Sequence, residues 1–183
     1  ANWRPNGSNL GYHGVISGSG GISSIGTHAL VLTNASNSYS GATTISSSGG
    51  IILKTNNGVL PNGTELTLSN SGFLALYSGV SQTIAKLVSS STDTKIFINK
   101  SITDTTGKLI INQSANTTFA GVINGFGGVT KTGSGNLTLS GANTYFGGTT
   151  INGGTIILGA AGVLSDTGFV SLANTSGVAL NLN

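Results

Sequence analysis

The 183-residue chain contains no cysteine and no methionine, which excludes a disulfide framework and a thiolate metal site. Charge is scarce as well, because only 6% of the residues are charged against about 25% in ordinary globular proteins. The net charge of +3 comes from scattered lysines and one arginine. No basic cluster could neutralise a run of phosphates, so we expect no nucleic-acid binding.

Long apolar runs are also missing. No window approaches the ~20 apolar residues of a membrane-spanning helix, and no segment keeps a helical apolar period over about 11 residues. The chain has instead 30 glycines and many short alternating runs, such as Leu30-Val31-Leu32 and Leu66-Thr67-Leu68. Runs of this kind between Gly-Gly and Asn-Gly corners predict short strands, and therefore an all-β fold with no substantial helix.

Two long segments share one pattern. Residues 20–53 and 127–158 align with an offset of 107 residues that two single-residue gaps reduce slightly. The aligned pairs include Leu137 with Leu30, Tyr145 with Tyr39, and Ile157 with Ile52. Self-similarity at a fixed period is typical of repeat architectures. We therefore divide the chain into a polar lead-in (1–11) and a single β-solenoid (12–183), which comprises a first unit (12–118) and a partial second unit (119–183).

The second segment carries the clearer signature. Its positions, with the aligned tyrosine of the first segment, are Gly127, Gly128, Gly133, Leu137, Leu139, Gly141, Tyr145, Gly147, Thr149, Ile151, Ile157 and Tyr39. This pattern resembles the autotransporter-associated β-strand repeat, also called the passenger-associated transport repeat. The resemblance implies a right-handed parallel β-helix in a secreted or surface-displayed passenger region of a Gram-negative autotransporter or large adhesin. The first segment departs from the pattern, since Asn34 stands where Gly141 stands.

The spacing of apolar pairs predicts the length of one turn. Leu137 and Leu139 are followed by the run 156–158 and then by Val178 and Leu180, in steps of roughly 19 and 22 residues that suit a three-faced solenoid rather than the ~8–12 of a sandwich. We therefore predict roughly eight or nine coils.

Stacked coils bury their inward side chains on one another, and this suggests which residues matter for packing. We predict that Leu139 and Ile157 face inward and that Lys131 lies on the surface. Glu65 and Lys86 are one coil apart in the sequence, so we expect them to lie side by side on adjacent coils.

Catalytic chemistry has few residues to use. The carboxylates are Glu65, Asp93, Asp104 and Asp166, which are too sparse for the acid pair of a polysaccharide-cleaving β-helix. We expect His13 and His28 at turn or surface positions, and we interpret the glycine clusters as corners, because none matches a phosphate-binding loop. The sequence therefore predicts no catalytic residue, no cofactor and no metal.

Tyr39 and Tyr145 allow two interpretations. Each follows a polar segment and could stack on a sugar ring, but their recurrence in both segments favours a ring packed at a corner with its hydroxyl hydrogen-bonded. Tyr77 adds a third aromatic to the carbohydrate hypothesis.

We expect a non-enzymatic spacer, adhesion surface or scaffold, secreted or on the cell surface (outer membrane) of a Gram-negative bacterium. The alternatives are a subunit of a self-assembling extracellular fibre and a carbohydrate-binding or polysaccharide-cleaving β-helix. Expected partners are neighbouring coils or head-to-tail copies, and host or biofilm surface glycans or proteins. An autotransporter would also carry a membrane β-barrel elsewhere in the full chain.

Overall fold

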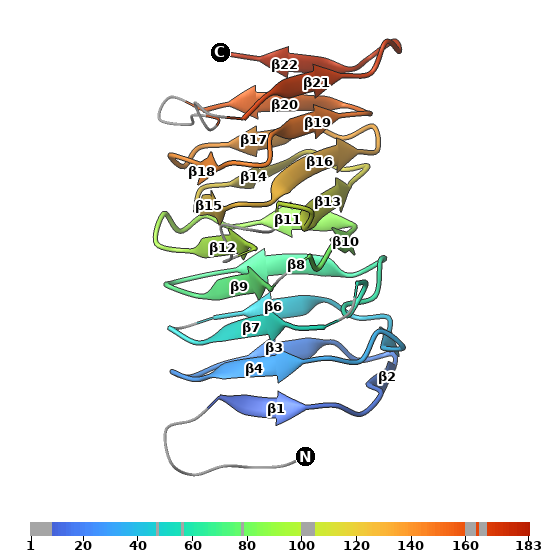
Figure 1. Ribbon diagram of the computed structural model, residues 1–183, viewed down its shortest axis with the longest axis vertical. Coiled ribbons are helices and arrows are strands. Elements are labelled where there is room, and N and C mark those ends of the chain that lie inside the picture. Colours follow the sequence, from blue (N-terminus) through green and yellow to red (C-terminus); the bar gives the residue numbers. More distant parts are fainter. Residues whose placement is uncertain are drawn as a thin grey trace.

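The structure is a computed structural model, which describes residues 9–46, 48–55, 57–77, 79–99, 105–159, 164 and 168–183. The chain winds upward from its N-terminal end into an elongated parallel β-solenoid of about seven turns (Figure 1). No helix occurs among the described residues, and these residues therefore contain no helix that could cross a membrane. The predicted all-β parallel β-solenoid is therefore confirmed, while its right-handed sense stays a prediction.

Three faces run along the solenoid. The first face is one seven-stranded sheet of β1 (Leu10–Tyr12), β4 (Ala29–Leu32), β7 (Gly50–Leu53), β9 (Phe73–Leu76), β12 (Lys95–Ile98), β15 (Val122–Gly125) and β18 (Thr144–Tyr145). The second face consists of β2 (Ser17–Gly18) and β5 (Ser38–Tyr39), then β10 (Gln82–Ile84), β13 (Lys108–Asn112), β16 (Gly128–Thr132), β19 (Thr149–Ile151) and β21 (Val170–Leu172).

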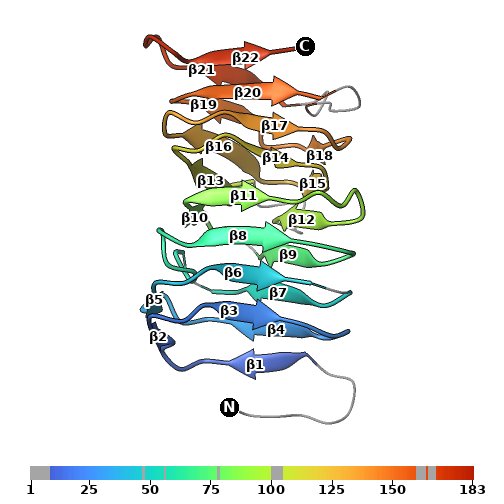
Figure 2. The same cartoon turned by 180° about the vertical axis from the view of Figure 1, so that it is seen from behind.

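The third face is best seen from behind (Figure 2). It consists of β3 (Ile22–Ser24), β6 (Thr43–Ile45), β8 (Glu65–Leu68) and β11 (Lys86–Val88), followed by β14 (Thr117–Phe119), β17 (Leu137–Leu139), β20 (Thr155–Leu158) and β22 (Ala179–Asn181). A parallel bridge between Ser89 and Phe119 joins the two groups.

The turns differ in length, and one of them is clearly longer than the sequence suggests. On the first face Leu10 pairs with Leu30, twenty residues later, but Ile96 pairs with Ile123, twenty-seven residues later. The extra residues lie mainly between Ile98, the end of β12, and Lys108, the start of β13. The prediction of eight or nine coils is therefore slightly high, because it assumed a uniform short turn.

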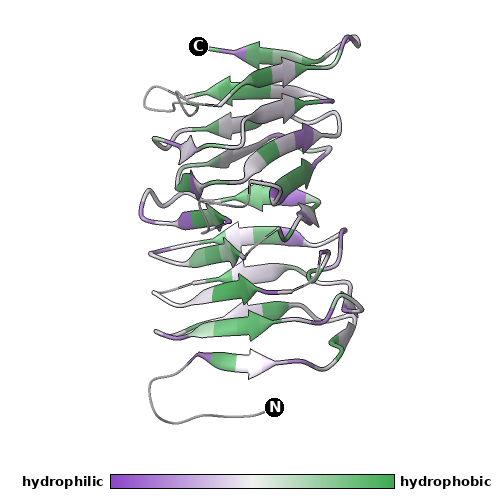
Figure 3. Cartoon of the chain, viewed as in Figure 1, coloured by the Kyte–Doolittle hydropathy of each residue, from purple (hydrophilic) through white to green (hydrophobic). Residues whose placement is uncertain are grey.

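The core is a set of aliphatic columns inside the solenoid. On the first face Leu32, Leu53, Leu76 and Ile98 lie on adjacent turns, and each is at most 1% exposed. In Figure 3 hydrophobic (green) stretches of strand recur on successive turns. Burying one such side chain contributes about 1.5–3 kcal/mol, so these columns hold turn on turn without disulfides.

Two packing predictions are wrong and two are confirmed. Leu139 is fully buried as predicted, but Ile157 pairs with outward-facing Thr138 and is only partly buried, because Ile156 takes the inward position of β20. Lys131 faces inward and is fully buried. The Lys86 ammonium lies 3.2 Å from the Glu65 carboxylate on the adjacent turn, so the expected ion pair is present.

Candidate functional site

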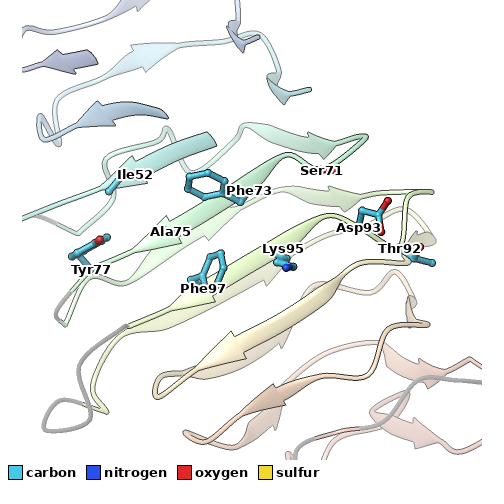
Figure 4. Close-up of a pocket in the computed structure, with 9 residues that line it drawn as sticks. All are labelled: Ile52, Ser71, Phe73, Ala75, Tyr77, Thr92, Asp93, Lys95 and Phe97. Atoms are coloured by element: carbon cyan, nitrogen blue, oxygen red, sulfur yellow. The ribbon is translucent and has the colours of Figure 1, made fainter. Parts of the chain in front are cut away.

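A groove with a volume of about 620 Å³ lies on the outward side of the first face. It crosses three adjacent strands, β7, β9 and β12 (Figure 4). Its lining residues are Ile52, Ser71, Phe73, Ala75, Tyr77, Thr92, Asp93, Lys95 and Phe97. Because side chains alternate across a strand, the outward side chains of these strands line a surface while the intervening ones fill the core.

One half of the groove is aromatic. Ile52 and Ala75 are neighbours in the sheet, are 7% and 5% exposed, and form the floor. Phe73 and Phe97 stand over them with their rings edge to face, at 82° and a centroid separation of 6.1 Å. Ala75 lies between Phe73 and Tyr77 along β9, and its small side chain keeps the floor lower than the three aromatic rings packed around it. A larger residue at this position would fill the groove.

The aromatic rings are held from beneath and from the side. Gly50 pairs with Phe73 in the sheet, and a Cβ on Gly50 would lie 2.5 Å from the Phe73 ring, so the ring packs directly onto the glycine backbone. Lys54 places its ammonium 5.0 Å from the centroid of the Tyr77 ring, a cation–π distance. Both contacts reduce the freedom of the rings before any ligand arrives.

The other half of the groove is polar. Ser71, Thr92, Asp93 and Lys95 are exposed and lie toward the end of the groove away from Tyr77 (Figure 4). Within the described part of the chain, the Asp93 carboxylate and the Lys95 ammonium form no ion pair. The groove therefore offers apolar ring surface at one end and hydrogen-bonding groups at the other.

Tyr39 and Tyr145 lie inside the solenoid, at 3% and 0% exposure. Their hydroxyls hydrogen-bond to Thr43 Oγ1 at 2.6 Å and to Thr149 Oγ1 at 2.5 Å. Burial raises the pKa of both hydroxyls, that of Tyr145 to about 12, and in each case the threonine hydrogen bond acts in the opposite direction. Neither ring presents a face on which a sugar could stack, and both tyrosines serve the packing of a corner.

A buried asparagine stands two residues before each tyrosine. Asn37 Oδ1 accepts the Ile16 N–H at 2.8 Å, and Asn143 Oδ1 accepts the Ile123 N–H at 2.9 Å, each from the turn below. Asn37 also donates to the carbonyl of Val59 on the turn above. Buried backbone groups need such partners where strand pairing is interrupted. The repeated Asn-x-Tyr-x-x-x-Thr pattern is therefore a polar clamp between turns.

The remaining candidate residues are dispersed. Glu65 is occupied by Lys86, and Asp93 lies in the groove. Asp104 and Asp166 lie outside the described residues. His13 and His28 are exposed as predicted, with Nδ1 contacts to Thr33 and Thr27. Among the described residues no three His, Asp or Glu side chains come together as a metal site would require.

The prediction from the sequence is furthest from the structure at Lys131, which was expected on the surface. It lies in the inward column between Ile111 and Ile151 and is fully buried. Its ammonium donates to the carbonyls of Thr132 at 2.6 Å, Gly133 at 2.9 Å and Gly153 at 3.2 Å. Desolvation lowers the pKa of the ammonium to about 8. Its position two residues after buried Val129 is the sequence feature that could have revealed this orientation.

The signature glycines allow corners of adjacent turns to touch. A Cβ on Gly147 would lie 2.5 Å from the carbonyl carbon of Gly127, one turn below. Gly133 has a φ of +74°, in the left-handed region that only glycine adopts without strain, and its backbone lies against Gln113. These positions are structural requirements of the repeat.

The two aligned segments occupy different faces of the solenoid. Tyr39 lies in β5 on the second face, whereas Tyr145 lies in β18 on the first face. On the third face the turns follow Ser24, Ile45, Leu68, Ser89, Phe119 and Leu139, so five turns take 115 residues. The offset of 107 residues between the segments is eight residues shorter than these five turns. Eight residues are about one strand with its corner, so the second copy begins on the second face, whereas the first copy begins on the third.

Comparison with known proteins agrees with this repeat. The family model described as passenger-associated-transport-repeat matches residues 25–52 and 129–158, the same two segments that align with each other. No curated protein and no solved structure matches the chain. The chain thus contains two passenger-associated transport repeats, wound into one parallel β-solenoid.

Proposed function

We propose that the chain is a non-enzymatic section of an autotransporter-like passenger rod, secreted or displayed on the outer membrane of a Gram-negative bacterium. The observation that carries the proposal is the combination of the two transport repeats with an uninterrupted first face of seven parallel strands. A stack of similar turns gains length and surface with each turn, because every turn packs only on its neighbours. Such an architecture suits a spacer or scaffold that holds a binding surface away from the cell.

The outer surface supports an adhesive role for this rod. Few residues of the chain are charged, and the groove between β7, β9 and β12 is a concave part of its surface lined by aromatic rings. Cleavage is not proposed for the groove. Asp93 is the one carboxylate among its lining residues, and glycoside hydrolysis generally uses two.

Labelling of intact cells tests the location. Antibodies raised against residues 1–183 should stain intact cells of the source bacterium, and external protease should remove the staining while a periplasmic marker stays protected. A culture supernatant that contains the antigen would equally support secretion. Staining that appears only after the outer membrane is permeabilised would contradict the proposal.

A further inference from the structure

The groove on the first face is preformed. Phe73 rests on Gly50, Tyr77 is held by Lys54, and Ala75 leaves the floor low between the rings. Its volume of about 620 Å³ lies within the range of roughly 300–1,000 Å³ typical of small-ligand pockets. A site whose side chains are already fixed loses little conformational entropy on binding.

We propose that this groove binds a neutral glycan through one or two of its pyranose rings. A pyranose has an apolar C–H face and a rim of hydroxyl groups. The face fits the aromatic half formed by Phe73, Tyr77 and Phe97, and the hydroxyl rim fits the Asp93 carboxylate and the Lys95 ammonium, which accept and donate hydrogen bonds respectively. The inference deepens the adhesive part of the proposed function by naming the class of ligand.

Other ligand classes fit the groove less well. A peptide strand cannot extend the sheet here, because β9 is paired on both sides, with β7 and β12, and its backbone groups are used. A hydrocarbon chain along the groove would cover Asp93 and Lys95 without giving them hydrogen bonds, which is costly. A polyanion would be repelled by the Asp93 carboxylate and would find one lysine, Lys95, among the lining residues. A neutral sugar fits both halves of the groove, because it has an apolar face for the aromatic rings and hydroxyl groups for Asp93 and Lys95.

The position of the aromatic residues predicts which changes matter. Phe97 and Tyr77 form the walls, so their loss should weaken binding most. Ala75→Leu should block the groove without removing any aromatic ring, because the added side chain would occupy the space over the floor. Phe146→Ala is the matched control, since Phe146 is another aromatic, 50% exposed, on the corner after β18, and it stacks on Phe126 rather than lining the groove.

The test uses the purified 183-residue chain and neutral tetrasaccharides of glucose, mannose, galactose, xylose and N-acetylglucosamine, with binding measured by NMR titration. We expect at least one of these to bind and to perturb signals of β7, β9 and β12. Phe97→Ala, Tyr77→Ala and Ala75→Leu should each weaken that binding at least about tenfold, whereas Phe146→Ala should leave it within twofold. Circular dichroism verifies that each variant is folded.

Three results would overturn the proposal. One is that none of the sugars binds, and another is that Ala75→Leu binds as tightly as the unmodified chain. The third is that an alkyl probe, hexanol, competes for the groove while the sugars do not, which would assign an apolar ligand. Because the cell-labelling experiment measures only location, a failure to bind sugars would leave the surface location supported and remove the glycan alone.

Discussion

The two transport repeats build the same corner from a slightly different set of residues. Tyr39 with Thr43 in the first repeat and Tyr145 with Thr149 in the second form equivalent buried hydrogen bonds, although the two corners lie on different faces. The repeat therefore specifies a local unit of strand, clamp and corner, and not a position around the solenoid axis. A copy can begin on any face because all three faces pack inward on the same kind of core.

The clearest difference between the repeats lies just before each corner. Ser24 stands where Lys131 stands, and its hydroxyl donates to the carbonyl of Gly50 at 3.0 Å. Lys131 donates to three carbonyls, including that of Gly153 on the next turn. Both side chains are buried and both tie one turn to the next. The lysine satisfies more carbonyls but must bury an ammonium to do so, which is costly.

The largest effect should come from a charge placed inside the second repeat. Leu139→Asp buries an unpaired carboxylate between turns and should cost several kcal/mol, enough to abolish the folded far-UV circular-dichroism spectrum. Ile157→Asp should leave the chain folded, because the outward side chain keeps contact with water. Equal thermal melts for the two variants would mean that the facing of β17 and β20 is wrong.

The buried ammonium predicts an unusual pH dependence. Its folded-state pKa of about 8 lies below the ordinary value of 10.5, so the unfolded chain binds more protons between these values. Stability should therefore rise by roughly 1–3 kcal/mol from pH 8 toward pH 10. Above about pH 10 it should fall, because the raised pKa values of Tyr39 and Tyr145 keep both protonated in the folded state only.

Urea unfolding at half-unit steps of pH would measure this profile. The Lys131→Met variant should lose the rise between pH 8 and 10 and keep the fall above it. A profile for Lys131→Met that is identical to that of the unmodified chain would show that the rise comes from another group.

At neutral pH the shape of residue 131 should matter as much as its charge. Lys131→Ala removes three hydrogen bonds to carbonyls, of which that of Thr132 keeps the Gln113 N–H. It also opens a space between Ile111 and Ile151, so it should cost about 2–3 kcal/mol. Lys131→Met fills the same space without burying a charge and should cost less. Ser24→Ala, which removes one hydrogen bond, should cost about 1 kcal/mol. Thermal melts rank the three variants. An unchanged melting temperature for Lys131→Ala would contradict the inward orientation of Lys131.

The smallest expected effect compares the two tyrosine hydroxyls. Tyr145→Phe and Tyr39→Phe each remove one buried hydrogen bond at a cost of about 1 kcal/mol. The Tyr39 change should cost no more than the Tyr145 change, because Thr43 keeps a second hydroxyl partner, Thr64, at 2.9 Å. Parallel thermal melts provide the measurement, and a much larger loss for Tyr39→Phe would contradict the equivalence of the corners.

The local features were accessible from the sequence because they depend on neighbouring residues. Alternating apolar runs predicted the strands, and a separation of about one turn predicted the Glu65–Lys86 pair. The orientations of Lys131 and Ile157 were mistaken for a different reason. In Thr-Ile-Ile-Leu (155–158) consecutive apolar residues leave the inward phase undefined, and Lys131 is polar at an inward position, where only hydrogen bonds to carbonyls make burial tolerable.

The groove could not be predicted from local sequence patterns, because its residues come from different strands. Ile52, Ala75 and Phe97 come together because β7, β9 and β12 pair in one particular register, with steps of 23 and 22 residues. Tyr77 was singled out as an aromatic, but its relation to Phe97 depends on that register. The number of turns was overestimated for the same reason, because the long step between β12 and β15 is invisible until the strands are paired.

The change of face between the two repeats is the central claim, and it depends on this long step. Because the chain lacks cysteine, a pair of engineered cysteines reports directly on it. Lys95→Cys with Val122→Cys places two outward residues opposite each other in adjacent strands of the first face, about 4.8 Å apart, within the range for a disulfide. Both copies would lie on one face only if the turns were uniformly about 21 residues long, since the offset of 107 residues would then be five turns, and Lys95 would lie beside Asn116. We predict that mild oxidation crosslinks the Lys95–Val122 pair rapidly and leaves a Lys95–Asn116 pair reduced, whereas the reverse result would contradict the change of face.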